Sequence, residues 1–189
     1  MHMDRAVVDP SSDVPEAGPY RLVRAADPLR ALARAVEYCA RHDAFAARPF
    51  GHWARVLIGQ VNRGHYRFAV EPGGADGPAR IVGFAGWFRA GRTAAERWMA
   101  DEACPDHDPR GDCVVLNAVA ADGADVLRAL HAGLGAAAPA PCTIFAKRLY
   151  PDGRVRPVRL PVAGPRARPE PFDPSRGPPG PDGPTAGRR

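Results

Sequence analysis

The sequence predicts a single α+β domain built on a mostly antiparallel sheet, and three patterns support this fold class. Apolar and polar side chains alternate with a period of two at 65–71, which is typical of a half-buried strand. Residues 81–88 are apolar almost throughout and follow a loop rich in glycine and proline, so the two runs predict an antiparallel hairpin. A strand, a short loop and a helix are predicted at 113–134, and a second hairpin at 142–160. Together these elements predict one sheet flanked by helices, with a single strand–helix crossover.

A chain of 189 residues with 45% hydrophobic content is long enough for one domain with a real core. We expect a flexible leader at 1–19, the folded domain at 20–162 and a disordered tail at 163–189, where proline, glycine and arginine dominate. The formal charge is +5, which permits acidic partners without identifying any. No segment has the roughly 20 apolar residues needed to span a bilayer, and the first residues lack a signal-peptide core. We therefore expect a cytoplasmic protein, with its four scattered cysteines reduced.

Two helices are predicted before the first strand of the central hairpin. Asp27 followed by Pro28 indicates a helix start, because aspartate accepts hydrogen bonds from free backbone N–H groups and proline is tolerated at the first helical position. The apolar stripe of this helix is expected to be Leu29, Leu32, Ala33, Val36 and Cys39 or Ala40. After Pro49, a second helix ending near Gly64 is expected. Its apolar face is predicted to be Phe50, Trp53, Leu57 and Val61.

Two further helices are predicted after the central hairpin. Thr93 and Glu96 have the spacing of a capping box, which predicts a short helix ending near Ala100. The segment 101–112 is acidic and contains proline, so we expect an exposed loop. Asp122 is predicted to cap the crossover helix. The apolar face of that helix is expected to be Val126, Leu127, Leu130 and Leu134.

Asn117 is the one polar side chain in the apolar run at 113–120. A polar group inside an apolar strand must find hydrogen-bond partners or destabilise the fold. Two interpretations stay open. The side chain lines a pocket, or it satisfies a neighbouring loop.

Four stretches resemble motifs of the toxin-activating lysine acyltransferases, a bacterial family that attaches fatty acyl chains to internal lysines of RTX toxins. VLIGQVNRGHYRFAV is similar to the family's helix and Gln-Tyr strand, and IVGFAGWF to its Gly-Phe-Ala-Ser-Trp-Ala strand. VVLNAVAADG is similar to the strand that ends in an Ala-Pro-Phe-Gly loop, and KRLYPDGRVRPVRL to the closing arginine-rich hairpin. The resemblance covers about residues 38–160, which is all of the predicted globular part.

This resemblance implies a GNAT-like fold with no bound cofactor. The donor it implies is a fatty acyl group carried on acyl carrier protein, and the acceptor is a lysine of an RTX-type partner protein. Members of the family are cytoplasmic and are often described as homodimers. In the family a histidine accepts the proton of the lysine amine, and an aspartate orients that histidine and stabilises its charge.

Both positions of that pair differ in this chain. Counting without gaps from Tyr66, the family's histidine falls on Phe45, and counting along the 113–120 run its aspartate falls on Asn117. Phenylalanine accepts no proton, and asparagine carries no charge. The resemblance therefore leaves two functions open: an acyltransferase, or a non-catalytic relative that binds an acyl carrier or an RTX-like partner without turnover.

His42 and Asn117 are the candidate catalytic residues. His42 lies about one helical turn before Phe45, so its ring is able to approach the same space. The other interpretation is an exposed histidine beside Asp43. His52 is expected in solvent, and His65 on the polar side of its strand. The residues assigned to substrate binding are Phe45, Trp87, Phe88, Asp122, Arg154 and Arg156.

Trp87 and Phe88 are in that set because the central strands of a GNAT-like fold splay, and an acyl chain needs apolar walls there. Arg154 and Arg156 belong to the closing hairpin, which is able to hold an acidic protein such as acyl carrier protein. The alternative for these arginines is a solvated basic edge that discourages strand pairing.

Three other classes of function are disfavoured by the sequence. No glycine-rich phosphate cradle follows Val119, so acetyl-CoA is a poor donor candidate. Cys104, His107 and Cys113 match no common spacing of zinc ligands, so no metal is expected. The basic tail has neither interleaved aromatic residues nor a known module, so nucleic-acid binding is not expected.

Overall fold

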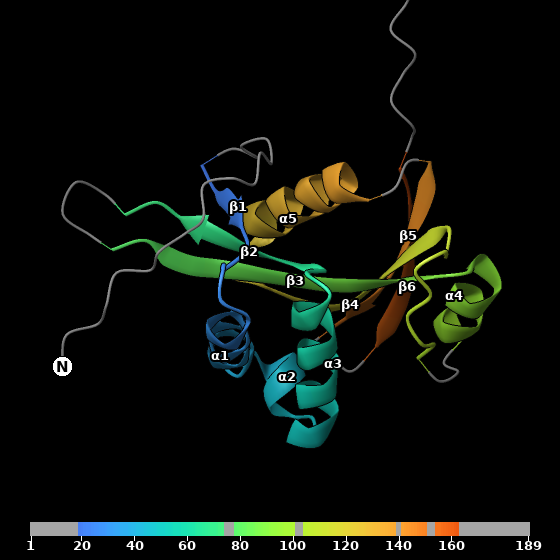
Figure 1. Cartoon of the computed structure of the whole chain (residues 1–189), viewed down its shortest axis with the longest axis horizontal. Helices are drawn as coiled ribbons and strands as arrows, with labels where there is room; N and C mark the ends of the chain where they lie inside the picture. Colours follow the sequence, from blue (N-terminus) through green and yellow to red (C-terminus); the bar gives the residue numbers. More distant parts are fainter. Residues whose placement is uncertain (1–18, 74–77, 101–103, 139–140, 151–153, 163–189) are drawn as a thin grey trace, which may run out of the picture.

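The computed structural model describes residues 19–73, 78–100, 104–138, 141–150 and 154–162. These residues form one six-stranded sheet with helices on both faces (Figure 1). In chain order the elements are β1 (Arg21–Val23), α1 (Pro28–Cys39), α2 (Asp43–Ala46), α3 (Phe50–Asn62), β2 (Tyr66–Glu71), β3 (Arg80–Ala90), α4 (Arg92–Met99), β4 (Cys113–Ala121), α5 (Ala124–Ala137), β5 (Cys142–Leu149) and β6 (Val155–Val162). The predicted α+β class, with helices flanking a mostly antiparallel sheet, is confirmed. The predicted tail and nearly all of the predicted leader lie outside the described residues.

The strands lie in the sheet in the order in which they occur in the chain, from β1 to β6. Neighbouring strands are antiparallel except β4 and β5, which are parallel and are joined by α5. A parallel pair needs a crossover connection, and this is the crossover that the sequence predicts. One face of the sheet is covered by α5, and the other by α1, α2 and α3 (Figure 1). Within the part of the chain that the structure describes, no helix is long and apolar enough to cross a membrane.

The central hairpin of β2 and β3 forms as predicted. Tyr66 and Phe68 of β2 are buried on the face that packs against α1 and α3. Every residue from 82 to 88 in β3 is buried, because helices cover both faces of the sheet there. Gly64 turns the chain from α3 into β2 with a φ of 67°, a conformation that favours glycine. The closing hairpin of β5 and β6 also forms as predicted.

The start of α1 is predicted correctly, and its apolar face is predicted in part, because Cys39 is buried and Leu32 and Val36 pack half-buried against the core. The Asp27 side chain accepts a hydrogen bond from the Leu29 amide at 2.9 Å, as expected of a cap. However, Leu29 is 77% exposed, and Ala33 and Ala40 are exposed as well. The buried side chains are Ala31, Ala35, Tyr38 and Cys39. Small alanines allow close approach of the helix, so the stripe that faces the core is narrower and rotated from the expected one.

The apolar face of α3 is mostly as predicted. Leu57 and Val61 are buried and Trp53 is half-buried. Phe50, at the first position of the helix, is 70% exposed, so its predicted burial is wrong.

The predicted capping box of α4 is absent. The N-cap residue Gly91 has no side chain to cap the helix, and the Arg92 amide in the first turn donates to Asp112 Oδ1 at 3.1 Å instead. Instead of returning to Thr93, the Glu96 carboxylate accepts hydrogen bonds from the guanidinium of Arg159 in β6. Charged residues of other segments therefore take the place of the predicted capping box.

Two short elements are present that the sequence pattern does not predict, β1 and α2. The three residues of β1 pair with β2 and bury only Leu22 fully. The four residues of α2 bury Phe45. Segments this short give no periodic signal, and long-range packing decides their conformation.

Candidate functional site

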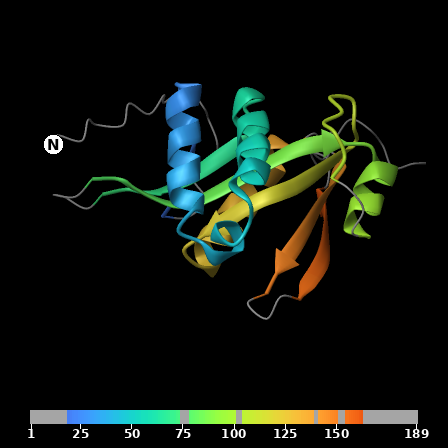
Figure 2. The same cartoon turned by 90° about the horizontal axis from the view of Figure 1, so that it is seen from below.

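β4 has a bulge at Asn117, and β4 stops pairing with β5 at the same residue. The pairing of β4 with β3 skips Asn117, because Leu116 and Ala118 face two consecutive residues of β3. The parallel pairing with β5 ends where Leu116 faces Ala146. Beyond these residues the two strands diverge, and the β5–β6 hairpin runs away from β4 (Figure 2). The expected splay of central strands is therefore present, in agreement with the GNAT-like fold class.

The side chain of Asn117 has a buried protein partner. Gln60 of α3 donates a hydrogen bond from its amide nitrogen to Asn117 Oδ1 at 2.5 Å. Burial raises the pKa of the nearby Cys104 thiol, and the Asn117 side chain opposes that rise. Gln60 is only 1% exposed, and its Oε1 has no partner among the described residues. That oxygen lies over Gly86, where a Cβ atom would come within 2.0 Å of it.

Asp122, at the end of β4, does not cap α5 as predicted. The N-cap residue of α5 is Gly123, and no side chain caps that end. The Asp122 carboxylate instead lies 2.8 Å from the Tyr38 hydroxyl, which is also 2.5 Å from the Val82 carbonyl oxygen. The single hydroxyl proton of Tyr38 is thus shared between two acceptors. Burial, followed by the hydrogen bond with Asp122, raises the pKa of Tyr38 well above its ordinary value.

His42 lies beside Asp122. Its Nε2 atom is 3.8 Å from Asp122 Oδ1, an ion-pair distance, and its ring packs 4.8 Å from the ring of Tyr38. The second carboxylate oxygen of Asp122 accepts a hydrogen bond from Arg80 at 3.2 Å. An imidazole and a carboxylate are therefore paired at the end of β4, where the turn before α2 meets β3 and β4. Sequence patterns do not predict this contact.

The structure does not bring the two candidate catalytic residues together. Asp122 follows Asn117 by five residues along extended chain, which corresponds to roughly 16 Å. His42 is near Asp122, and its side chain shares no hydrogen bond or ion pair with that of Asn117 among the described residues. The bulge and the imidazole–carboxylate pair are thus two separate groups on β4.

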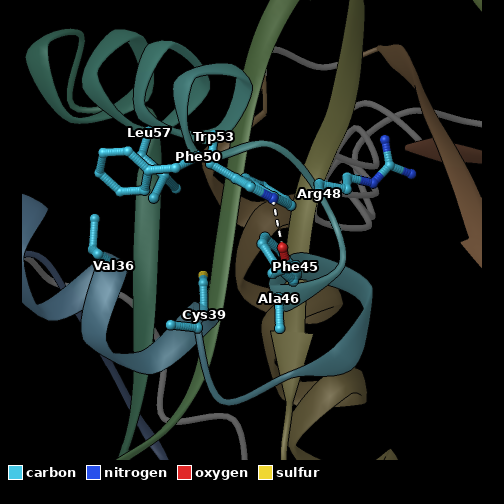
Figure 3. A pocket seen from close by; sticks show the side chains of 9 residues that line it. Val36, Cys39, Phe45, Ala46, Arg48, Phe50, Trp53 and Leu57 are labelled. Carbon is cyan, nitrogen blue, oxygen red and sulfur yellow. Dashed lines mark hydrogen bonds between the residues drawn. The ribbon is translucent and has the colours of Figure 1, made fainter.

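Phe45 lies in α2 and is 6% exposed. Its ring stacks on that of Trp53 with centroids 3.8 Å apart, and the Trp53 indole N–H donates to the Phe45 carbonyl at 2.9 Å. Next to this pair is a pocket of about 180 Å³ between α1, α2 and α3 (Figure 3). Its apolar lining includes Val36, Cys39, Phe45, Phe50, Trp53 and Leu57.

Trp87 and Phe88 are both buried, 5% and 4% exposed, and neither lines this pocket. Consecutive residues of a strand point to opposite faces. Trp87 packs with the cluster under α5, whereas Phe88 packs with Met99 of α4 and Phe145 of β5. The apolar run of β3 alone does not show whether Trp87 or Phe88 lies on a face of the sheet that a ligand is able to reach.

Arg154 and Arg156 are exposed on the closing hairpin. The Arg154 guanidinium lies 5.5 Å from the centre of the Tyr150 ring, and Arg148 lies 4.9 Å from it. Arg156 pairs directly with Arg148 in the β5–β6 register. Like charges are therefore held side by side at this edge of the sheet, where they produce a positive surface.

His65 is half-buried rather than exposed at the surface. Its ring is 5.1 Å from that of His107, and its Nδ1 atom is buried without a partner among the described residues. Burial, followed by the nearby positive charges of His107, Arg63 and Arg89, lowers the pKa of His65 to about 4. The pKa of His107 is lowered as well, mainly by burial. These two histidines are therefore weak bases.

The four cysteines are free, and three of them, Cys39, Cys113 and Cys142, are buried. Burial raises the pKa of Cys39 to about 12, so its thiol stays neutral at physiological pH. Across the described ranges, no group of three or more His, Cys, Asp or Glu side chains is placed to hold a metal ion.

The chain has a distant structural likeness to an acetyltransferase. No protein-family model matches the chain, and no curated protein matches it. A solved structure described as histone acetyltransferase HPA2 and related acetyltransferase, from Corynebacterium glutamicum, is 21% identical, with a TM-score of 0.41 and coverage of 70% of this chain and 78% of that chain. This is a distant likeness, and the resemblance to toxin-activating acyltransferases stays a prediction.

Proposed function

We propose that this protein is a toxin-activating lysine acyltransferase-like enzyme, which moves a fatty acyl group from acyl carrier protein to a lysine of an RTX-type partner. The observation that carries the proposal is the splay of β4 and β5 at the Asn117 bulge. Residues 117–121 of β4 have no strand partner on their β5 side. An extended thioester arm is able to use those backbone groups by adding along the strand edge.

Charge favours a protein carrier over coenzyme A as the donor. The Asp122 carboxylate stands at the start of α5, where a diphosphate would otherwise bind, and its negative charge repels phosphate. Arg154 and Arg156 make the nearby closing hairpin positive. An acidic carrier protein fits that surface, and such complementarity speeds its association and sets its orientation.

The attacking lysine needs a base, and His42 is the residue that fits this role best. Neither Phe45 nor Asn117 accepts a proton. Burial depresses the pKa of both His65 and His107, which makes them poor proton acceptors. His42 is partly exposed and lies beside the Asp122 carboxylate, which is able to orient the ring and stabilise its charge. The amine would therefore approach along β4, with its proton passing to His42.

The test uses the full chain, acyl carrier protein loaded with labelled fatty acids of several lengths, and an RTX-type acceptor. Acylated lysines are located by mass spectrometry. We expect transfer, and we expect His42→Ala to slow it about 100-fold, the lower end for loss of a general base. The matched control is His52→Ala, because His52 is an exposed histidine of α3 that should leave the rate unchanged. Absence of transfer at every chain length would overturn the enzymatic proposal.

A second candidate, a non-catalytic protein that binds an acyl carrier or an RTX-like partner, is supported by a separate observation. Phe45 is locked in a stack with Trp53, and Asn117 is already engaged by Gln60. On this alternative the acylated carrier binds and is not discharged. Phe45→His combined with Asn117→Asp should then create activity, whereas wild-type turnover that His42→Ala abolishes would contradict it.

A further inference from the structure

We propose that the pocket between α1, α2 and α3 holds the apolar end of a short acyl chain, about six carbon atoms long. The identity of the ligand rests on the acyl transfer proposed above. The existence of an apolar subsite rests on the pocket itself, so the two claims can fail separately.

The lining of the pocket is suited to an apolar group. Cys39 and Val36 of α1 face Trp53 and Leu57 of α3, and the ring of Phe45 closes one side (Figure 3). A neutral, buried Cys39 thiol behaves as a small apolar group in such a wall. A water molecule needs two to four polar partners, and these side chains supply almost none.

Arg48 is the one charged residue of the lining. Figure 3 shows its guanidinium pointing away from the other labelled side chains. The charge therefore stands outside the apolar space. A ligand that fits must be apolar inside the pocket, and any polar or charged part must remain at its mouth.

The volume limits the length of the chain. The pocket measures about 180 Å³. An apolar cavity of about 150 Å³ in another protein takes up benzene, a molecule of six carbons. Each methylene buried in such a space strengthens binding roughly four-fold, and the gain stops once the chain outgrows the pocket. We therefore expect a preference for about six carbons.

The position of Phe45 relates the pocket to β4. Phe45 belongs to the same buried cluster as Ala118 and Ala120. These two alanines lie in the part of β4 that has no β5 partner. The mouth is open as well, since Phe50 at its rim is 70% exposed. An acyl chain carried along β4 would thus find its apolar receptor where the family resemblance places a histidine.

Binding is measured first, without any transfer reaction. The probes are N-acetylcysteamine thioesters of butanoic, hexanoic and decanoic acids, titrated into the full chain by calorimetry. Ala46→Trp fills the pocket, because Ala46 lines it, whereas Ala47→Trp places the same side chain on the neighbouring exposed residue that does not line it. We expect hexanoyl to bind roughly 15-fold more tightly than butanoyl and about as tightly as decanoyl. Ala46→Trp should weaken hexanoyl binding at least ten-fold, and Ala47→Trp should leave it within two-fold.

Equal binding by Ala46→Trp and Ala47→Trp would overturn the inference, and so would affinity that keeps rising to decanoyl. If Ala46→Trp does not fold, Ala40→Phe provides a second filling of the same pocket. The assay with acylated carrier protein separates the two claims. Probe binding without transfer supports the subsite and contradicts the enzyme, whereas transfer with the same chain-length preference in Ala46→Trp contradicts the subsite alone.

Discussion

Removal of the Tyr38 hydroxyl tests whether the contact between α1 and the end of β4 stabilises the fold. The ring of Tyr38 is 2% exposed, so Tyr38→Phe keeps the packing and removes only the oxygen. The lost hydrogen bonds are those to Asp122 Oδ1 at 2.8 Å and to the Val82 carbonyl oxygen at 2.5 Å. Among the described residues, no other buried side-chain hydrogen bond links α1 to this end of the sheet.

The expected loss follows from the partners that remain. Val82 O still accepts a hydrogen bond from the Asp122 amide at 2.9 Å. The Asp122 carboxylate keeps Arg80 at 3.2 Å and water on its exposed side. Because both acceptors keep other hydrogen-bond partners, the free energy of unfolding should fall by the value of a hydrogen bond to a charged group, about 1.5–3 kcal/mol. In a chain of this size, such a loss lowers Tm by roughly 3–12 °C.

Urea unfolding at neutral pH measures the change in the free energy of unfolding. Tyr20→Phe is the matched control, because Tyr20 is partly buried and its hydroxyl makes no hydrogen bond within the described residues. A Tyr38→Phe variant within about 0.5 kcal/mol of both wild type and the control would refute the reasoning, because a surface-like substitution has that magnitude.

The pH dependence supplies a second readout with a definite sign. The folded state raises the pKa of Tyr38 above its unfolded value of 10.0. The contribution of this hydroxyl to the free energy of unfolding is therefore fully present below pH 10. It is lost as the pH rises further, because the unfolded chain then ionises while the folded chain does not. Wild type should therefore lose stability above about pH 10 more steeply than Tyr38→Phe. Parallel curves in that range would contradict the buried environment assigned to this hydroxyl.

Two other substitutions probe the site on β4 and the buried histidine. Gly86→Ala places a methyl group 2.0 Å from Gln60 Oε1 and should destabilise the fold by about 1–3 kcal/mol in urea unfolding. The control is Gly51→Ala in α3, where nothing lies within 4 Å of the added methyl group, and this substitution should stabilise the fold. Equal effects of the two substitutions would contradict the close approach of Gln60 to Gly86. The folded state lowers the pKa of His65 from 6.5 to about 4, so its stabilising effect is present above pH 6.5 and is lost as the pH falls toward 4. His65→Gln should flatten the stability profile across that window while His52→Gln leaves it unchanged, and an unaltered slope in His65→Gln would show that this histidine is not the group responsible.

The elements that sequence reasoning predicts well are those with local signals. The β2–β3 hairpin combines alternation in one strand, an apolar run in the other and turn residues between them. The crossover of β4, α5 and β5 is also predicted by local signals, an apolar run followed by an amphipathic helix pattern. Val126, Leu130 and Leu134 of α5 are buried as expected. Asp27 caps α1 because a cap needs only residues two or three positions away.

The features that sequence reasoning misses depend on distant partners. Asp122 has the pattern of a helix cap, yet Tyr38, which is 84 positions away, takes its carboxylate. Glu96 has the pattern of a capping box, yet Arg159 takes its carboxylate across 63 positions. Charged and hydroxyl partners compete with local caps, and only the folded chain brings them near. The bulge at Asn117 likewise comes from the register with β3, which one strand does not encode alone.

The environment of Asn117 suits a neutral side chain. Gln60 is buried against Gly86 and binds Asn117 as one neutral amide to another. An aspartate at that position would place a charged carboxylate in a half-buried site, which is harder to desolvate than the neutral amide of asparagine. Phe45 likewise fills its position with an apolar ring stacked on Trp53. Farther along β4 the described residues instead pair an imidazole with a carboxylate, His42 with Asp122.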